Sequence, residues 1–304
     1  MQLNMEFDIQ FRKERSRHIS MLTEQQRTKI VNVSKVPHRS PFRYPGGKTW
    51  LIPQIRLWLG NRVPRVRELI EPFAGGGIVG LSAVFDELVD MSTLVETDPD
   101  VAAVWRVILH ENADELIDSI STFEVNEHNV RTALAQRDVA PSRRAFLTIL
   151  KNRVNRGGIL APGAGLIKSG ENNRGLLSRW YPETLCHRIR DIVAVRQRLC
   201  GLQADGFSVI EQNACRSDVV FFVDPPYTVA GKRLYAHSVV DHHRLFELMH
   251  VVRGEFLMTY DDTTEIANLA QKFGFENRRI PMKNTHHDEK FELLIGRDLK
   301  WLPE

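Results

Sequence analysis

The sequence predicts an α/β fold built on a parallel, doubly wound sheet and interrupted by an inserted, mostly helical lobe. The sheet is predicted by two strand–turn–helix units: "RELIEPF", "AGGG" and "IVGLSAVFDEL" form the first, and "TLVET" with "DPDVAAVWRVI" forms the second. This rhythm is typical of parallel α/β sheets. The lobe is predicted because the rhythm stops from about residue 111 to 206, where the sequence becomes helical, basic and interrupted by glycine.

The remaining segments complete this division of the chain. The first 38 residues are polar and contain "FRKERSR", so we expect an amino-terminal arm there. From Pro41 onward, "YPGGKTWLIPQIRLWLG" predicts a glycine turn followed by a helix. Further strands are expected at "VVFFV", "EFLMTY", "NRRIPM" and "FELLIG". The predicted domains are therefore an arm at 1–38, a catalytic domain at 39–110 and 207–304, and a lobe at 111–206.

Composition limits the classes of protein that fit. A chain of 304 residues with 42% hydrophobic content can bury a large core. Its three cysteines form neither a C-x-x-C pair nor an even framework, which disfavours a disulfide scaffold and a structural zinc site. With neither a signal peptide core nor a long apolar run, a cytoplasmic location is expected. The net charge of +3 permits nucleic-acid binding without requiring it.

A glycine-rich turn and a following acidic residue give the first chemical signal. In "EPFAGGGIVG" the glycines allow a ligand to approach the backbone closely, although a tight turn without a ligand is the plain alternative. The turn matches neither G-x-G-x-x-G nor a P-loop, which disfavours phosphate binding. Glu96 ends the next strand, where such sheets hold a ribose by its hydroxyls. The plain alternative for Glu96 is an acid favoured by the dipole at the start of a helix, and it applies more strongly to Asp98. Together the turn and Glu96 predict a nucleoside cofactor.

The strand "VVFFV" ends on "DPPY", Asp224 to Tyr227, which is the second chemical signal. A strand of a parallel sheet delivers its last residues to the binding crevice. The carboxylate of Asp224 and the carbonyl of Pro225 could both accept from one amino group, and Tyr227 offers a face for a planar base. Two acceptors would localise the nitrogen lone pair and prepare it to attack an electrophilic methyl group. The plain alternative is a proline-terminated strand with a capping aspartate.

At these residues the chain resembles a known family. "FRYPGGK" (42–48), "EPFAGGG" (71–77) and "DPPY" (224–227) follow the order found in Dam-like, D12 class (alpha-group) DNA adenine-N6 methyltransferases. The resemblance extends over about residues 40–300 and includes "NRVNRGG", "SRWYPETL" and "KFELLI". It implies a Rossmann-like, S-adenosylmethionine-dependent methyltransferase sheet with an inserted target-recognition lobe, in agreement with the rhythm of the sequence.

The resemblance also implies site residues. Those implied to be catalytic are Asp224, Pro225, Pro226 and Tyr227. Those implied to bind the cofactor are Tyr44, Gly46, Gly47, Lys48, Glu71, Pro72, Phe73, Ala74, Gly75, Gly77, Glu96, Thr97, Asn213 and Asp224. Two positions depart from the family pattern, which usually has aspartate at the positions of Glu96 and Asn213. Glu96 should still reach a diol, and the side-chain oxygen of Asn213 can still accept from an adenine amine.

The lobe carries the candidate DNA contacts. Basic residues beside glycine loops could hold phosphates, and the expected contacts are Arg153, Arg156, Lys168, Arg174 and Arg179. Trp180 and Tyr181 could stack on or wedge between bases. The helix "HRIRDIVAVRQRL" has an apolar side and is better explained as a partly buried basic helix. The pairs His242–His243 and His286–His287 do not favour a metal site, because adjacent helical residues face different directions.

These observations predict a site-specific methyltransferase that transfers a methyl group from S-adenosylmethionine to N6 of a flipped-out adenine in double-stranded DNA. The enzyme could act as an orphan or beside a partner restriction endonuclease. Two alternatives stay open at this point: an RNA adenine-N6 methyltransferase, and a nucleic-acid-binding relative that has lost catalysis. The intact DPPY argues against the second alternative.

Overall fold

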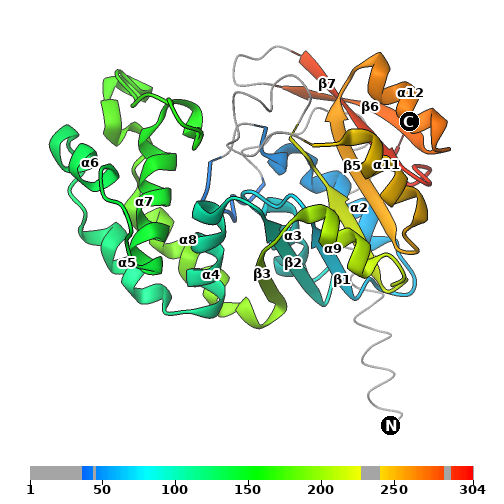
Figure 1. Ribbon diagram of the computed structural model, residues 1–304, viewed down its shortest axis with the longest axis horizontal. Coiled ribbons are helices and arrows are strands. Elements are labelled where there is room, and N and C mark those ends of the chain that lie inside the picture. Colours follow the sequence, from blue (N-terminus) through cyan, green and yellow to red (C-terminus); the bar gives the residue numbers. More distant parts are fainter. Residues whose placement is uncertain (1–35, 44–45, 227–239, 284–288, 304) are drawn as a thin grey trace, which may run out of the picture.

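The computed structural model describes residues 36–43, 46–226, 240–283 and 289–303. Within these ranges the chain forms a mixed α/β sheet flanked by helices, with a helical lobe at one edge (Figure 1). Residues 1–35 of the predicted arm lie outside the described residues, and so do Tyr44 and Tyr227. Within the described ranges, no helix combines the length and the apolar character needed to cross a membrane.

The sheet has seven strands in the order β3-β2-β1-β4-β5-β7-β6. Strands β1 to β5 pair in parallel, and β7 inserts antiparallel between β5 and β6, so that β6 points the same way as the first five. The order is that of a Rossmann-like sheet with its last strands rearranged into an antiparallel pair. The strands are β1 (Glu68–Glu71), β2 (Met91–Glu96), β3 (Leu199–Gln203), β4 (Val219–Val223), β5 (Glu255–Asp261), β6 (Glu276–Lys283) and β7 (Glu289–Gly296).

Alternation along the strands divides the core between the two faces of the sheet. Leu69, Phe222 and Leu257 join one apolar cluster, whereas Ile70 and Phe221 join the other. The first face is covered by η2 (Lys48–Leu51), α2 (Ile52–Gly60), α3 (Ile78–Phe85) and α4 (Pro99–His110). The second face is covered by α9 (Gly206–Asn213), α11 (His242–Val251) and α12 (Thr264–Lys272).

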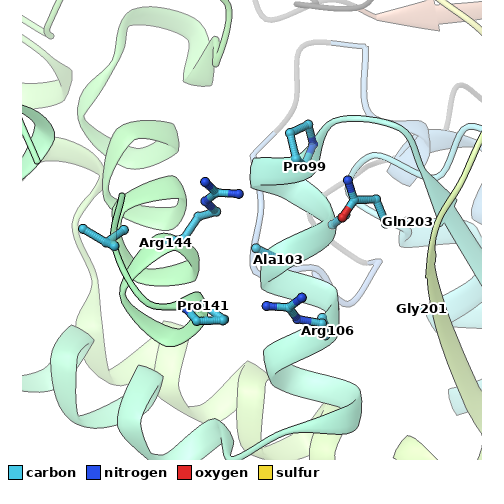
Figure 2. Close-up of a pocket in the computed structure, with 9 residues that line it drawn as sticks. Pro99, Ala103, Arg106, Pro141, Arg144, Gly201 and Gln203 are labelled. Atoms are coloured by element: carbon cyan, nitrogen blue, oxygen red, sulfur yellow. The ribbon is translucent and has the colours of Figure 1, made fainter. Parts of the chain in front are cut away.

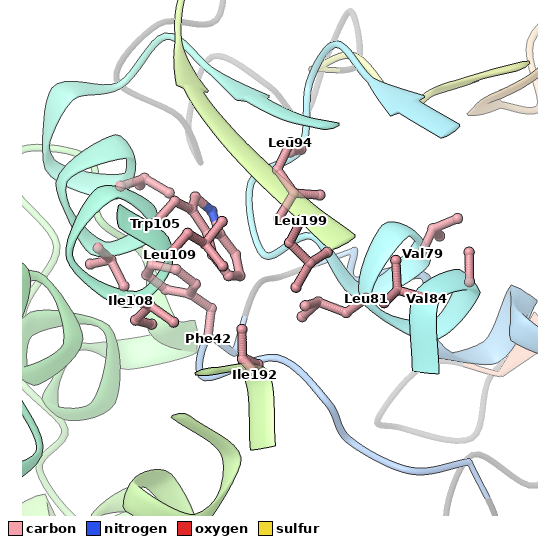
Figure 3. Packing of buried hydrophobic residues seen from close by; sticks show 14 of the residues in the cluster. Phe42, Val79, Leu81, Val84, Leu94, Trp105, Ile108, Leu109, Ile192 and Leu199 are labelled. Atoms are coloured by element: carbon pink, nitrogen blue, oxygen red, sulfur yellow. The ribbon is translucent and has the colours of Figure 1, made fainter. Parts of the chain in front are cut away.

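The lobe continues the first apolar cluster. Figure 3 shows Ile192 of the lobe near Phe42, Trp105 and Leu109, all of which belong to this cluster. The lobe therefore shares its core with the sheet domain. Its elements are α5 (Ala113–Thr122), α6 (Glu127–Leu134), α7 (Pro141–Val154), η3 (Arg156–Gly158), η4 (Glu171–Asn173), η5 (Gly175–Arg179), α8 (Pro182–Ala194) and η6 (Arg196–Arg198).

The predicted end of the lobe at residue 206 needs correction. β3 lies inside the predicted lobe range, yet it pairs with β2 along its whole length, with Glu96 opposite Gln203. The short segment "LCGLQ" was not recognised as a strand because it contains glycine and only half of it is apolar. The helical lobe therefore ends before Leu199, where the chain returns to the sheet.

Local chemistry explains where the helices begin. Asp98 caps α4 by accepting from the N–H of Asp100, and Pro99 takes the first helical position. This agrees with the interpretation of Asp98 as a capping acid. Asp205 and Asp241 cap α9 and α11 in the same way, by accepting from the N–H groups of Ser208 and Arg244.

Gly80 allows α3 to lie against the sheet. A Cβ at this position would overlap Ser92, Leu94 and the carboxylate of Glu71. We therefore expect Gly80→Ala to destabilise the protein by about 1–3 kcal/mol, because overpacking forces the helix away from β1 and β2. Gly165→Ala is the matched control: nothing lies within 4 Å of its Cβ position, so its effect should stay within about 0.5 kcal/mol. Urea unfolding measures both, and equal effects would contradict this packing.

Candidate active site

The candidate site lies at the carboxyl edge of the sheet, on the face that bears α2 and α3. Glu71 ends β1, Asp224 directly follows β4, and Thr259 lies near the end of β5. Alternation places these side chains on one face, because Leu69, Phe222 and Leu257, each two residues before, all join the first apolar cluster. Glu292 of β7 lies on the same face, two residues before Leu294.

Asp224 is held from two sides. Its Oδ2 lies 3.0 Å from the ammonium Nζ of Lys48, and its Oδ1 accepts a hydrogen bond of 2.7 Å from the hydroxyl of Thr259. The Asp224 side chain keeps 25% of its surface exposed, whereas Lys48 keeps only 3%. The carboxylate is therefore held by buried groups, while a quarter of the side chain stays exposed.

The ammonium of Lys48 has three protein acceptors. Besides Asp224, it donates to the carbonyl of Gly46 at 2.8 Å and lies 3.6 Å from Oε2 of the buried Glu292. A lysine has three N–H groups, so these acceptors can use all of them. The structure thus shows Lys48 bonded inside the protein. The predicted cofactor contact of Lys48 would require one of these bonds to be exchanged.

Glu71 is fully buried beside α3. Its Oε1 accepts from the N–H of Gly80 in the first turns of that helix. Burial raises the pKa of Glu71 to about 8, and the nearby charge of Asp224 also raises it, while the Gly80 hydrogen bond opposes the shift. Glu71 therefore carries its proton at neutral pH and adds no negative charge to the site.

The glycine-rich turn after β1 is bonded to β2 and α4. The N–H of Ala74 donates to the carbonyl of Val95, and Trp105 of α4 donates its indole N–H to the carbonyl of Gly75. Gly75 and Gly77 have φ of 48° and 59°, a region that favours glycine. The turn is therefore held open and close to the end of β2.

Glu96 connects the turn to the start of α4. Its Oε2 accepts from the N–H of Gly75 at 3.1 Å, and its Oε1 accepts from the N–H of Asp98 at 2.9 Å. Burial raises the pKa of Glu96, and the two N–H donors oppose the shift. The residue as a whole is half-buried at the end of β2. Thr97, also predicted to contact the cofactor, donates its hydroxyl to the carbonyl of Ala204 beside β3.

The prediction for Asn213 was wrong. Asn213 is the last residue of α9 and lies at the end of that helix away from the carboxyl edge of β3. Its amide donates to the carbonyl of Val209 and accepts from Arg216. The sequence misled because the length of α9 was not recognised.

Asp205 and Phe207 occupy the start of α9, at the carboxyl edge of the sheet, and sequence analysis missed both. Phe207 packs edge-on against Phe73 of the glycine-rich turn, with ring centroids 6.1 Å apart. Gly206 between them lies against the carbonyl of Pro72, where a Cβ would overlap it. The signal that could have found them is "DGF" directly after the third strand.

The predicted DNA contacts divide into three groups. Arg156, Lys168 and Arg174 are exposed in the loops between α7 and α8. Arg179 is half-buried and lies 3.8 Å from Glu171. The prediction for Arg153 was wrong: its side chain is 3% exposed and donates to the carbonyl of Pro41. It lies in the last turn of α7, with its side chain turned inward, so DNA cannot reach it in this arrangement.

Two aromatic residues and the loop glycines complete the lobe. Trp180 is 5% exposed and packs against Phe123, so it cannot wedge into DNA, whereas Tyr181 is 40% exposed.

Asn152 accepts from the N–H of Arg43 and donates to its carbonyl, which joins α7 to the segment that leads to Lys48. Gly158 is required there, because its Cβ would overlap the Arg43 carbonyl.

The neighbouring histidines contact different partners. Nδ1 of His242 lies 3.0 Å from the Tyr260 hydroxyl, and Nε2 of His243 lies 2.7 Å from Nζ of Lys272. His286 and His287 lie outside the described residues. Within the part of the chain that the structure describes, no three His, Cys, Asp or Glu side chains are grouped to hold a metal ion.

A separate pocket of about 210 Å³ lies between α4, α7 and β3 (Figure 2). Pro99 and Ala103 line one wall and Pro141 another, and the guanidinium groups of Arg106 and Arg144 reach toward the space between the two helices. None of the predicted site residues lines this pocket. This pocket is therefore separate from the candidate site at the carboxyl edge of the sheet.

The buried carboxyl of Glu71 predicts a pH-dependent stability. Its pKa is raised from 4.5 to about 8, so between these values the folded protein keeps a proton that the unfolded chain releases. The free energy of unfolding should therefore fall as the pH rises from about 5 to about 8. Glu71→Gln keeps the acceptor for Gly80 and cannot ionise, so it should lack this part of the decline. Urea unfolding across this range compares the two proteins, and a difference that does not change with pH would contradict the assignment.

Comparison with known proteins agrees with the geometry. A family model described as "D12 class N6 adenine-specific DNA methyltransferase" matches residues 44–140. Two curated relatives, both named DNA adenine methylase and from two strains of Vibrio cholerae serotype O1, are 24% identical over 269 residues, with 82% of each chain covered.

Likeness among solved structures is weaker. The rRNA methyltransferase aviRa from Streptomyces viridochromogenes has 12% sequence identity and a TM-score of 0.37, covering 88% of this chain and 94% of that chain. A score this low carries no argument about function. The matched family model and the two relatives, with the three motifs in their order along the chain, support a likeness of this protein to the Dam-like, D12 class N6-adenine-specific DNA methyltransferases.

Proposed function

We propose that this protein transfers a methyl group from S-adenosylmethionine to the N6 amino group of an adenine in double-stranded DNA. The observation that carries the proposal is the carboxylate of Asp224 directly after β4, which is a quarter exposed and is held by Lys48 and Thr259. Asp224 is followed by two prolines, which have no N–H, so that the Pro225 carbonyl is a second acceptor at this point.

The residues fit a nucleoside cofactor. Glu96 is a half-buried residue at the end of β2, and a carboxylate there can accept from ribose hydroxyls. The glycine-rich turn brings main chain close to the same place, and Phe73 and Phe207 lie beside it. When bound, S-adenosylmethionine would supply an electrophilic methyl group on a sulfonium sulfur.

The side chains of the protein would prepare the nucleophile. Asp224 and the Pro225 carbonyl would each accept a hydrogen bond from the adenine amino group. These two bonds would draw the hydrogens out of the ring plane, so that the nitrogen lone pair points outward. Bound S-adenosylmethionine would supply the methyl group and leave as S-adenosylhomocysteine, and the methylated amine would pass one of its protons to solvent. Catalysis of this kind depends on position and charge and needs no covalent intermediate with the protein.

The exposed basic residues of the lobe support a nucleic-acid substrate. Arg156, Lys168 and Arg174 follow α7 in loops, and the guanidinium of Arg174 lies 5.6 Å from the ring centroid of Tyr181. Such residues bind phosphates and fix the register of a duplex. We expect these three residues, already predicted from the sequence, to contact DNA in this segment without Arg153.

The Asp224→Ala variant tests this function. We expect wild-type protein to transfer tritiated methyl groups from S-adenosylmethionine to DNA as N6-methyldeoxyadenosine, and Asp224→Ala to lose at least about 100-fold in rate. Asp218→Ala is the matched control, because Asp218 directly precedes β4 at its other end and pairs with Arg216. A folded Asp224→Ala protein with wild-type turnover would contradict the proposed role of Asp224. Label found only in RNA would favour the RNA alternative.

Glu96 and Asp98 can be separated by cofactor affinity. Loss of a charged hydrogen-bond partner costs about 1.5–3 kcal/mol, so Glu96→Ala should weaken S-adenosylmethionine binding roughly ten- to a hundredfold, with partial recovery in Glu96→Asp. Asp98→Ala should change affinity much less, because Asp98 caps α4. Calorimetric titration of the three variants measures this. The ribose assignment fails if Asp98→Ala loses the cofactor and Glu96→Ala does not.

A further inference from the structure

Thr259 is a buried polar residue in an otherwise apolar part of β5. Its neighbours Met258 and Tyr260 point into the second apolar cluster, and Thr259 itself is fully buried on the opposite face. A buried hydroxyl destabilises a protein unless it forms a hydrogen bond. Thr259 therefore needs a partner, and a valine of nearly the same shape would need none.

The register of the sheet supplies that partner. Val223 of β4 pairs with Met258 of β5, which places Thr259 beside Asp224. The Thr259 hydroxyl donates to Oδ1 of Asp224 at 2.7 Å, a short hydrogen bond to a charged acceptor. The bond therefore joins the residue after β4 to a residue fixed in the middle of the sheet.

Two donors on different oxygens hold the carboxylate in one orientation. Thr259 binds Oδ1 while the Lys48 ammonium lies 3.0 Å from Oδ2. With Lys48 alone, the carboxylate could turn about its Cβ–Cγ bond and still keep one oxygen against the ammonium. A carboxylate has about four lone-pair positions, so it can accept from these two donors and from further groups at the same time.

We propose that Thr259 is a positioning residue for methyl transfer: its hydroxyl fixes the plane of the Asp224 carboxylate, and so the direction from which that carboxylate meets the target amino group. This inference rests on the proposed function, because it assigns Thr259 to the site that would hold adenine. Thr259 acts through Asp224 and need not touch the substrate.

Three variants test the role of the hydroxyl. Thr259→Val removes it while keeping the shape, and Thr259→Ser keeps it. Thr93→Val is the matched control, because Thr93 is also a buried strand threonine and its hydroxyl donates to the carboxylate of Glu68 at 2.6 Å. Glu68 is the first residue of β1 and lies at the opposite end of that strand from Glu71.

The expected result is a split between rate and binding. Thr259→Val should lower kcat by about 10- to 100-fold, because small displacements of a catalytic group cost up to about 100-fold, while KM for DNA and S-adenosylmethionine stays within about threefold. Thr259→Ser should retain most of kcat, and Thr93→Val should behave as wild type. Wild-type kcat in Thr259→Val, or equal losses in Thr259→Ser and Thr259→Val, would overturn the proposal.

A crystal structure of Thr259→Val gives a readout that does not depend on turnover. The Asp224 carboxylate should turn about Cβ–Cγ relative to the wild-type protein while Lys48 keeps its contact. An unchanged orientation would overturn the positioning role, whatever the substrate is. If wild-type protein methylates no DNA, the proposed function fails, and the crystallographic comparison still decides the role of Thr259.

Discussion

The buried ammonium of Lys48 is the interaction on which the rest of the site depends. A lysine that is 3% exposed must be paired, because an unpaired buried charge is strongly destabilising. Its acceptors come from three distant parts of the chain: Gly46 precedes η2, Asp224 follows β4, and Glu292 belongs to β7. The strand order β4-β5-β7 brings the last two to one face, and this order exists because β7 inserts antiparallel beside β5.

Carboxyl groups gather around Lys48. Its ammonium lies against the carboxylates of Asp224 and Glu292. Glu71 lies close to Asp224, but burial raises its pKa to about 8, so that it keeps its proton at neutral pH. The junction with the lobe has the opposite character, because Arg43, Arg179 and Arg188 surround Arg153, and burial and their charges lower its pKa to about 9.

The sequence predicted features that are local along the chain. The glycine-rich turn, the capping role of Asp98 and the position of Asp224 after an apolar strand all depend on neighbouring residues, and the structure agrees with each. Thr259 and Glu292 could not be predicted, because their roles depend on which strands pair and in which register. Arg153 and Trp180 were misassigned for a related reason: basic and aromatic side chains in a lobe suit DNA binding, and only packing shows that these two point inward. The end of the lobe was misplaced because β3 is a short edge strand with weak apolar character.

In the proposed function Lys48 acts by holding Asp224, because its three protein acceptors can use all of its N–H groups. The most direct measurement is S-adenosylmethionine affinity and single-turnover methyl transfer in Lys48→Met, with Lys48→Met/Glu292→Gln to remove one of the two carboxylates that lose their contact with Lys48. Because breaking a buried ion pair costs about 3–5 kcal/mol, thermal unfolding must first show that both proteins are folded. We predict affinity within about threefold of wild type and a transfer rate lower by about 100-fold or more. Loss of cofactor binding with an unchanged transfer rate in the bound fraction would contradict the account.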